Sequence, residues 1–180
     1  FRADRISSHE EGKGEDRRRV TVFKGNIYVA QGNPDSELFL EMRADTAVVF
    51  SAIRPAGAAD DANRSGIPYA PKMTGVESPG GGTEVVTGIY LDGDVVIARG
   101  SRYMRGPTAY YDFTTDRALM IDPVFRAVEP DREIPVYVRA EEARVLSDRE
   151  VVFRHAQVST SDFHTPSFSI NAREAYLKNE

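Results

Sequence analysis

The sequence contains a repeated unit, and this unit limits what the chain can fold into more than any other feature. Residues 25–32 (GNIYVAQG) and 93–100 (GDVVIARG) share one form: a turn pair that begins with glycine, β-branched or aromatic residues at most of the next positions, a polar residue and a closing glycine. Their first residues are 93 − 25 = 68 positions apart. Self-similarity at this scale predicts a stack of like supersecondary units.

A shorter pattern, polar–small–x–x–Ala, supports the same interpretation. Its last three copies begin at Arg105, Arg139 and Asn171, which gives steps of 139 − 105 = 34 and 171 − 139 = 32 residues. Apolar or aromatic residues follow each copy. Small residues at fixed positions of a repeat indicate places where facing elements approach closely. The copies are 43–47 (RADTA), 105–109 (RGPTA), 139–143 (RAEEA) and 171–175 (NAREA).

Between the repeats the chain is typical of short antiparallel strands. Leu38, Leu40 and Met42 alternate with residues of the opposite face, and turn residues separate the β-favouring runs. Residues 140–153 and 172–178 contain strong helix formers, so helices are the alternative there. We predict strands in both segments, because the repeat relates them to the β-rich run at 47–50.

The expected organisation is one β-domain over residues 20–180. Residues 1–19 are polar and predict a lead-in segment or a loosely held first strand, with a frayed end. Residues 52–84 are rich in Gly, Pro, Ala, Asp and Ser and predict a long inserted loop. The chain begins with Phe1 rather than methionine, so we expect a mature chain or an excised piece.

Composition excludes several classes of protein. A hydrophobic share of 41% with nine Phe and eight Tyr argues against disorder, and no apolar run approaches the length of a membrane span. A net charge of −5 disfavours nucleic-acid binding, which needs a basic face. The absence of cysteine excludes disulfides and thiolate chemistry.

No motif for catalysis or metal binding stands out. The three histidines are not at ligand spacing, so we expect no metal and no cofactor. His155 occupies the turn position that Gly25 has in the first unit, which indicates a structural role. Ser159 or Ser161 with His164 has the residue types of a hydrolase, but there is no nucleophile elbow and such clusters are typical of turns. We therefore predict a protein that is not an enzyme.

Two stretches carry a resemblance to a known family. Residues 23–32 (FKGNIYVAQG) lead to 43–50 (RADTAVVF), and the form appears again from Gly93 to Gly100 and on to 109–112 (AYYD). These stretches resemble the OstA-like family, which comprises the lipopolysaccharide-transport proteins of the periplasmic bridge and the N-terminal periplasmic domain of the outer-membrane lipopolysaccharide-assembly protein. The 52–84 loop and the segment 127–134 depart from the compact bridge protein and favour a domain of a larger assembly protein.

The resemblance implies a jellyroll-like or V-shaped, solenoid-like stack of antiparallel strands, open at both ends. It implies non-enzymatic binding and transport of lipopolysaccharide or a related lipid in an apolar groove. The chain would be periplasmic and, within a larger protein, associated with the outer membrane. Partners would be other OstA-like proteins that join by edge-strand addition, together with head-to-tail copies of the chain. The expected groove residues are Ile27, Val29, Leu38, Leu40, Val49, Val95, Ile97, Tyr103, Ala109, Tyr111, Val136, Val138 and Val152.

A second hypothesis from a different class stays open beside this one. The same repeats and apolar periodicity fit a self-assembling β-solenoid or β-sandwich that binds other copies and no lipid. A one-residue error in strand register would exchange the two faces of each strand, so the sequence does not decide which face is inward.

Overall fold

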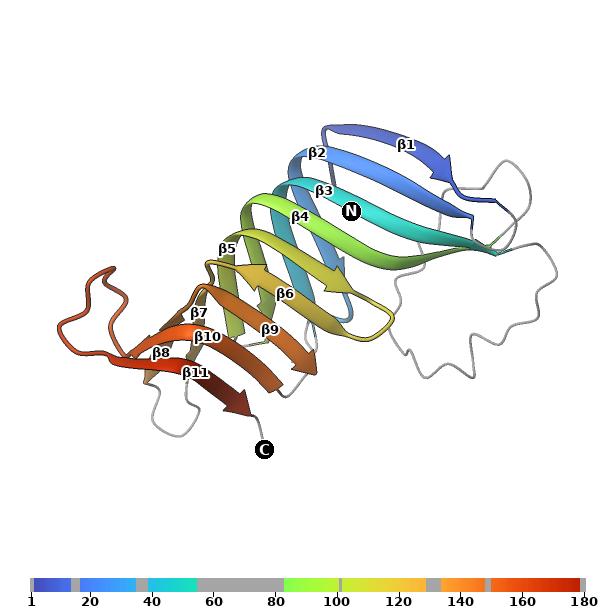
Figure 1. The fold of residues 1–180 in the computed structure, drawn as a ribbon. Helices are drawn as coiled ribbons and strands as arrows, with labels where there is room; N and C mark the ends of the chain where they lie inside the picture. Colours follow the sequence, from blue (N-terminus) through green and yellow to red (C-terminus); the bar gives the residue numbers. More distant parts are fainter. Residues whose placement is uncertain are drawn as a thin grey trace.

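The structure is all-β, and every ladder in its single sheet is antiparallel (Figure 1). This computed structural model describes residues 2–13, 17–34, 39–54, 83–100, 102–128, 134–147 and 150–178. Within those ranges there is no helix, and hence none that could cross a membrane. The strands are β1 (Arg5–Glu11), β2 (Arg18–Gln31), β3 (Leu40–Arg54), β4 (Thr83–Arg99), β5 (Arg102–Asp112), β6 (Arg117–Ile121), β7 (Val124–Val128), β8 (Pro135–Arg139), β9 (Glu142–Ser147), β10 (Glu150–Ser159) and β11 (Ile170–Lys178).

Six of the strands form a closed barrel. The circuit of ladders runs β5–β6–β9–β10–β8–β7 and returns to β5. It closes because β5 and β10 are bent: each pairs with one neighbour before its bend and with another after it. Strands β4, β3, β2 and β1 extend the sheet on one side of β5, and β11 pairs with β10 on the other.

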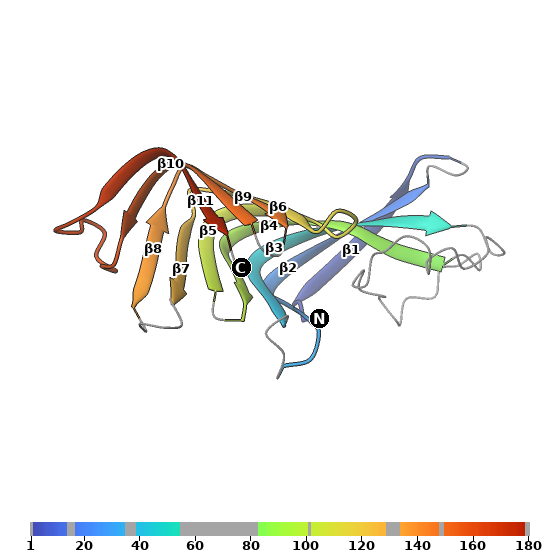
Figure 2. The same ribbon diagram turned by 90° about the horizontal axis from the view of Figure 1, so that it is seen from below.

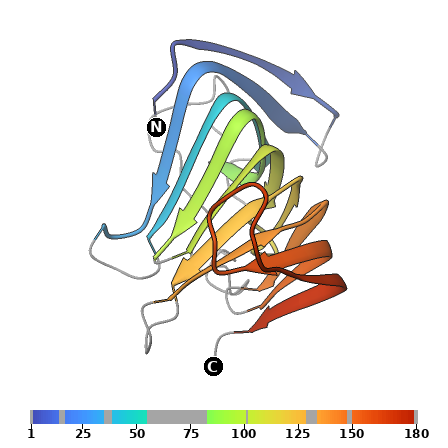
Figure 3. The ribbon, with the colours of Figure 1, turned by 90° about the vertical axis from the view of Figure 1, so that its left-hand side faces the viewer.

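A line of corners crosses the whole sheet. At each corner the ladder skips one to three residues, and several corner residues have positive φ angles, which turn the chain sharply. Two leaves therefore meet at this line, as the view along the stack shows (Figure 3). The corners lie at 25–26, 44–45, 93–94, 106–107, 122–123, 140–141, 155 and 173.

We name the leaves by their residues. The first leaf contains β1, 18–24, 46–54, 83–92, 108–112, β6, β9, 150–154 and 174–178. The second leaf contains 27–31, 40–43, 95–99, 102–106, β7, β8, 156–159 and 170–172. Seen from below, β5, β7 and β8 fan out on the near side and β6 and β9 lie behind them (Figure 2).

The polar–small–x–x–Ala repeat marks the corners of alternate strands. Its copies fall on β3, on β5, across β8 and β9, and on β11. Ala47, Ala109 and Ala143, at the last position of three copies, are all buried. At Gly106 an added Cβ would lie 2.8 Å from the backbone oxygen of Ile121. The prediction of close approach at small residues is confirmed at these positions.

The structure adds a further copy that the pattern missed. Arg2-Ala3-Asp4 lies beside the first corner: Arg2 bridges to Tyr28, and the Asp4 N–H donates to the carbonyl of Lys24 at 3.0 Å. The predicted lead-in therefore includes a strand, β1, whose side chains are nearly all exposed. The fifth position of this copy is Ile6 instead of alanine, so the pattern did not detect it.

The disputed segments are strands. In the segment 140–153 a corner at 140–141 precedes β9, and residues 150–153 begin β10, whereas residues 148–149 lie outside the described part of the chain. Residues 172–178 belong to β11. Of the predicted inserted loop, 52–54 extends β3 and 83–84 begins β4. Residues 55–82 lie outside the described part of the chain.

Candidate functional site

The two leaves enclose one apolar interior. On β4 the side chains of Val95 and Ile97 point inward together with Ile89 and Leu91 of the other leaf. Alternation along each strand then places the intervening side chains on the outer face. The buried cluster includes Phe23, Ile27, Leu40, Met42, Ala44, Ala47, Val49, Val86, Ile89, Leu91, Val95, Met104, Ala109, Tyr111, Phe113, Met120, Phe125, Val138, Ala143, Val151, Phe153 and Ala156.

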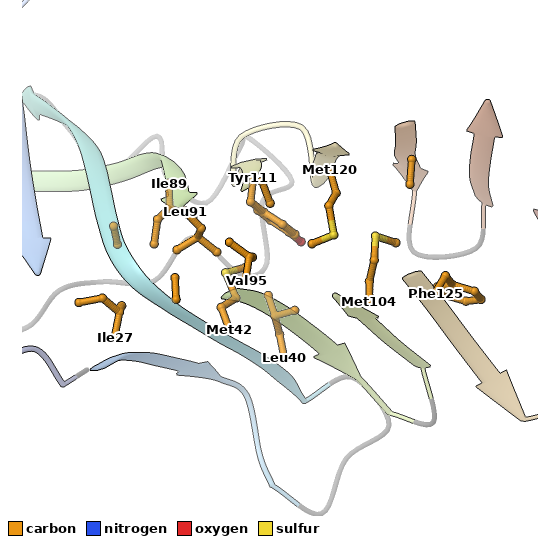
Figure 4. Close-up of a cluster of buried hydrophobic side chains, with 14 of the residues drawn as sticks. Ile27, Leu40, Met42, Ile89, Leu91, Val95, Met104, Tyr111, Met120 and Phe125 are labelled. Atoms are coloured by element: carbon orange, nitrogen blue, oxygen red, sulfur yellow. The ribbon is translucent and has the colours of Figure 1, made fainter. Parts of the chain in front are cut away.

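A cavity of about 70 Å³ lies inside this cluster, between the leaves. Leu40, Ile97 and Met104 line it from the second leaf, and Tyr111 and Met120 line it from the first. Figure 4 shows Tyr111 and Met120 facing Met104 and Leu40 across this gap. The packed residues continue on both sides of the cavity along the stack.

Most of the residues predicted for a groove face this interior. Ile27, Leu40, Val49, Val95, Ala109, Tyr111 and Val138 belong to the buried cluster, and Val29, Ile97 and Val136 pack against it. Leu40, Ile97, Tyr103 and Tyr111 also line the cavity. Tyr103 alternates with buried Met104 and borders the cavity at its rim. Leu38 lies outside the described residues.

Val152 does not lie with this set. It is only partly buried and stands between two buried neighbours, Val151 and Phe153, which point into the interior. Its ladder partners are Arg144 and Tyr176, which are exposed. The corner at 140–141 causes the difference. Before it the inward-facing residues of β8 have even numbers, such as Val138, and after it those of β9 have odd numbers, such as Ala143.

Polar groups gather at the rim of the cavity. Arg99 ends β4 in the second leaf, Arg102 begins β5 opposite it, and both line the cavity. The Arg99 Nη1 lies 3.7 Å from Oδ2 of Asp116, which follows the first-leaf strand segment of β5. The hydroxyl of Tyr111 donates to the other oxygen, Oδ1, of Asp116. One carboxylate thus links the open edges of the two leaves.

Tyr111 has a perturbed titration. Burial raises its pKa above the ordinary value, and the hydrogen bond to Asp116 raises it further. The hydroxyl therefore stays protonated and continues to donate to Asp116 well above neutral pH. The rim could not be predicted from the sequence, because residues 99, 102 and 116 meet only after two hairpins have formed. The one local signal is the presence of two arginines, Arg99 and Arg102, three positions apart.

A second polar feature lies in the N-terminal part of the first leaf. Arg19 is buried and its guanidinium forms ion pairs with Glu84 at 2.6 Å and Glu10 at 2.8 Å. The hydrogen bond to Glu10 and the charge of Glu84 raise the pKa of Arg19, against the effect of burial. These three residues connect β1, β2 and β4 and satisfy one another, so they offer no open site.

The residues considered for other chemistry have ordinary structural partners. Ser159 Oγ donates to the Phe168 carbonyl at 2.8 Å, which occupies the proton that a hydrolase would transfer. His155 lies at a corner, in the turn position that the repeat predicted, with a positive φ angle, and its Nδ1 is 2.8 Å from Oε2 of Glu141. Within the described ranges no group of three or more His, Asp or Glu residues could hold a metal ion.

We compared the sequence with models of protein families and with curated proteins. No family model and no curated protein matches it.

Proposed function

We propose that this protein is a non-enzymatic carrier that binds the acyl chains of a lipid between its two leaves. The observation that carries the proposal is the cavity, because its wall is formed mainly by apolar side chains from both leaves. A ligand pocket of this kind is lined by apolar groups with a few polar groups at one side, and the rim at Arg99 and Asp116 supplies these.

The finer architecture is part of this proposal. The corner line and the two leaves support a jellyroll-like, V-shaped stack, solenoid-like in its repeats and open at both ends. The resemblance of residues 23–32 and 43–50 to the OstA-like family then suggests lipopolysaccharide as the lipid and transport through the periplasm to the outer membrane. On this proposal the chain is one domain of a larger, outer-membrane-associated assembly protein.

The energetics favour such binding but require movement. At about 0.8 kcal/mol for each buried CH₂, a chain of about twelve methylenes gains on the order of 10 kcal/mol before ordering costs. The cavity of about 70 Å³ is roughly half the volume of a cavity known to bind benzene, about 150 Å³. It holds only part of an acyl chain, so the leaves must separate at the rim for the rest to enter.

Filling the cavity tests the proposal. Ala118 lines the cavity, and Ala118→Leu places three more carbon atoms inside it. We expect purified lipopolysaccharide and n-dodecyl maltoside to bind the wild-type protein in native mass spectrometry, and Ala118→Leu to weaken both at least fivefold. The matched control is Ala98→Leu, which makes the same change on the strand that carries Ile97, at a position of opposite face. It should bind as the wild type does.

The outcomes separate clearly. Circular dichroism first establishes that both variants are folded. Equal binding by wild type, Ala118→Leu and Ala98→Leu would show that lipid binds elsewhere on the protein. No binding of either lipid by the wild-type protein would refute the carrier function itself.

A second candidate function is self-assembly without lipid. In the described part of the chain β1 pairs only with β2 and β11 only with β10, so both ends of the sheet are edges. Exposed edges can accept a strand from another copy or from a like domain. Ile170 on β11 is 59% exposed, and a lysine there adds charge to this edge. Concentration-dependent assembly in sedimentation velocity without lipid, reduced by Ile170→Lys, would favour this candidate.

A further inference from the structure

Two charged side chains, those of Arg99 and Arg102, lie at the rim of a cavity whose wall is otherwise mainly apolar. Arg99 and Arg102 are a cross-strand pair at the end of the β4–β5 hairpin, and both contribute to the cavity wall. Like charges directly opposite one another on two strands are destabilising. Such a pair beside an apolar cavity therefore gives this side of the rim a positive potential, which favours an anion nearby.

The charge of Arg99 is only loosely compensated. Its Nη1 is 3.7 Å from Asp116, near the outer limit for an ion pair, and its buried Nε has no hydrogen-bond partner among the described residues. Buried donors are nearly always satisfied, so an unsatisfied one calls for an explanation. Arg105 on β5 differs in this respect, because its guanidinium is engaged by one carboxylate. Its Nε donates to Oδ1 of Asp94 at 2.7 Å, and its Nη2 lies 2.6 Å from the same Oδ1.

The Asp116 carboxylate is not positioned to accept a hydrogen bond from the Nε of Arg99. One of its oxygens accepts the hydroxyl proton of Tyr111, and this bond holds the carboxylate toward the first leaf. Arg99 is in the second leaf, on the other side of the rim. If the leaves separate at the rim to admit an acyl chain, as the proposed function requires, Arg99 moves away from Asp116 and its guanidinium becomes available to an incoming anionic group.

We propose that Arg99 and Arg102 bind the anionic head group, a phosphate or carboxylate, of a lipid whose acyl chain enters the cavity. This inference rests on the proposed carrier function and adds to it the chemistry of the head group. A guanidinium presents donors in a planar fork that matches the oxygens of phosphate and carboxylate. Head group and chain then occupy adjoining surfaces, so charge fixes the orientation in which the lipid enters.

The test compares two amphiphiles with the same chain. n-Dodecyl phosphate has an anionic head and n-dodecyl maltoside a neutral one, and both are titrated below their critical micelle concentrations by calorimetry. We expect Arg99→Gln and Arg102→Gln each to weaken dodecyl phosphate binding at least tenfold more than dodecyl maltoside binding. Arg126→Gln is the matched control, because Arg126 is exposed on β7 and does not line the cavity.

Each result has one meaning. If both amphiphiles bind the wild type and the Arg99 and Arg102 variants bind dodecyl phosphate normally, the head-group site is wrong while the carrier function stands. If neither amphiphile binds the wild type, the carrier function itself fails. Inorganic phosphate that binds as tightly as dodecyl phosphate would show a free-anion site instead of a lipid site.

The salt dependence of amphiphile binding to the wild-type protein tests the same site without any substitution, so it does not depend on whether the variants fold. Raising NaCl from 50 to 500 mM should weaken dodecyl phosphate binding severalfold more than dodecyl maltoside binding, because salt screens the guanidinium charges. An equal response of the two amphiphiles would overturn the head-group assignment without any substitution.

Discussion

Gly93 shows how tightly a single corner is built. Its φ angle is +80°, and a Cβ added there would lie 2.6 Å from Oδ2 and 2.8 Å from Cβ of Asp45. Gly25 has the same relation to Asp4, with φ +81° and a closest contact of 2.2 Å. The Ala-Asp of one strand thus packs over the glycine of the next strand at the corners of β2 and β4.

We expect Gly93→Ala to destabilise the protein by about 1–3 kcal/mol, because it combines a strained backbone with the contact to Asp45. Urea unfolding measures the loss. In the double variant Gly93→Ala/Asp45→Gly the contact is gone and only the backbone strain remains, so part of the stability should return. Strict additivity of the two substitutions would mean that the contact with Asp45 contributes nothing.

Tyr111 gives the interior a dependence on alkaline pH. The folded state raises its pKa above the ordinary value of 10.0, so folding favours the protonated hydroxyl. The resulting stabilisation is fully present below pH 10 and is lost as the pH rises through the raised pKa. We expect the free energy of unfolding of Tyr111→Phe to fall less steeply than that of the wild type above pH 10. Identical slopes for the two proteins would contradict this role.

At the scale of elements, the ion pairs of Arg19 hold β1 and β4 to β2. Removing one partner of a buried ion pair leaves the other charge uncompensated, which costs about 3 kcal/mol or more. We expect Arg19→Met to lower the free energy of unfolding by about 3 kcal/mol in urea titrations. Arg18→Met is the neighbouring control: Arg18 pairs with Glu11 at 2.8 Å on the exposed surface, and such pairs contribute about 0–1 kcal/mol. Equal losses for the two variants would refute the distinction.

The strands could be predicted from the sequence where the repeat constrained them. Helix propensity alone would have misassigned residues 142–147 and 150–153, but the repeat related them to β-rich segments, and they belong to β9 and β10. Propensity failed there because the strands are fixed by ladder partners far away in the chain, such as the pairing of β9 with β6.

The inward face was predictable along a single strand but not across a corner. Val95 and Ile97 could be paired by alternation within β4, and they share the inner face. Val152 could not be placed in this way, since the parity of alternation changes at some corners and not at others. The rim at Arg99 and Asp116 was beyond prediction for a similar reason: the contact spans two leaves whose relation depends on every corner between them.

At the scale of the molecule, stability should decrease toward the two edges. β3 lies between β2 and β4 with long ladders on both sides, and its side chains Met42, Ala47 and Val49 are buried. β1 has one ladder and mostly exposed side chains. Strands of the first kind open only with global unfolding, whereas edge strands open locally.

Hydrogen exchange measured by mass spectrometry checks this gradient. We expect the slowest amide exchange at 42–49 in β3 and 89–95 in β4, and the fastest strand exchange in β1. Addition of n-dodecyl phosphate should slow amide exchange near the cavity more than in β1. Uniform protection from β1 to β4 would mean that the sheet opens as one unit.

The corner line has a consequence for how such a chain can change in length. Each bent strand pairs only with the strands beside it and extends both leaves by one strand spacing, about 4.8 Å. Duplicating a segment that encodes two successive bent strands would lengthen the apolar interior by about 10 Å while leaving its cross-section unchanged. Such growth needs no new core design, because every added unit brings its own corner and its own inward-facing side chains.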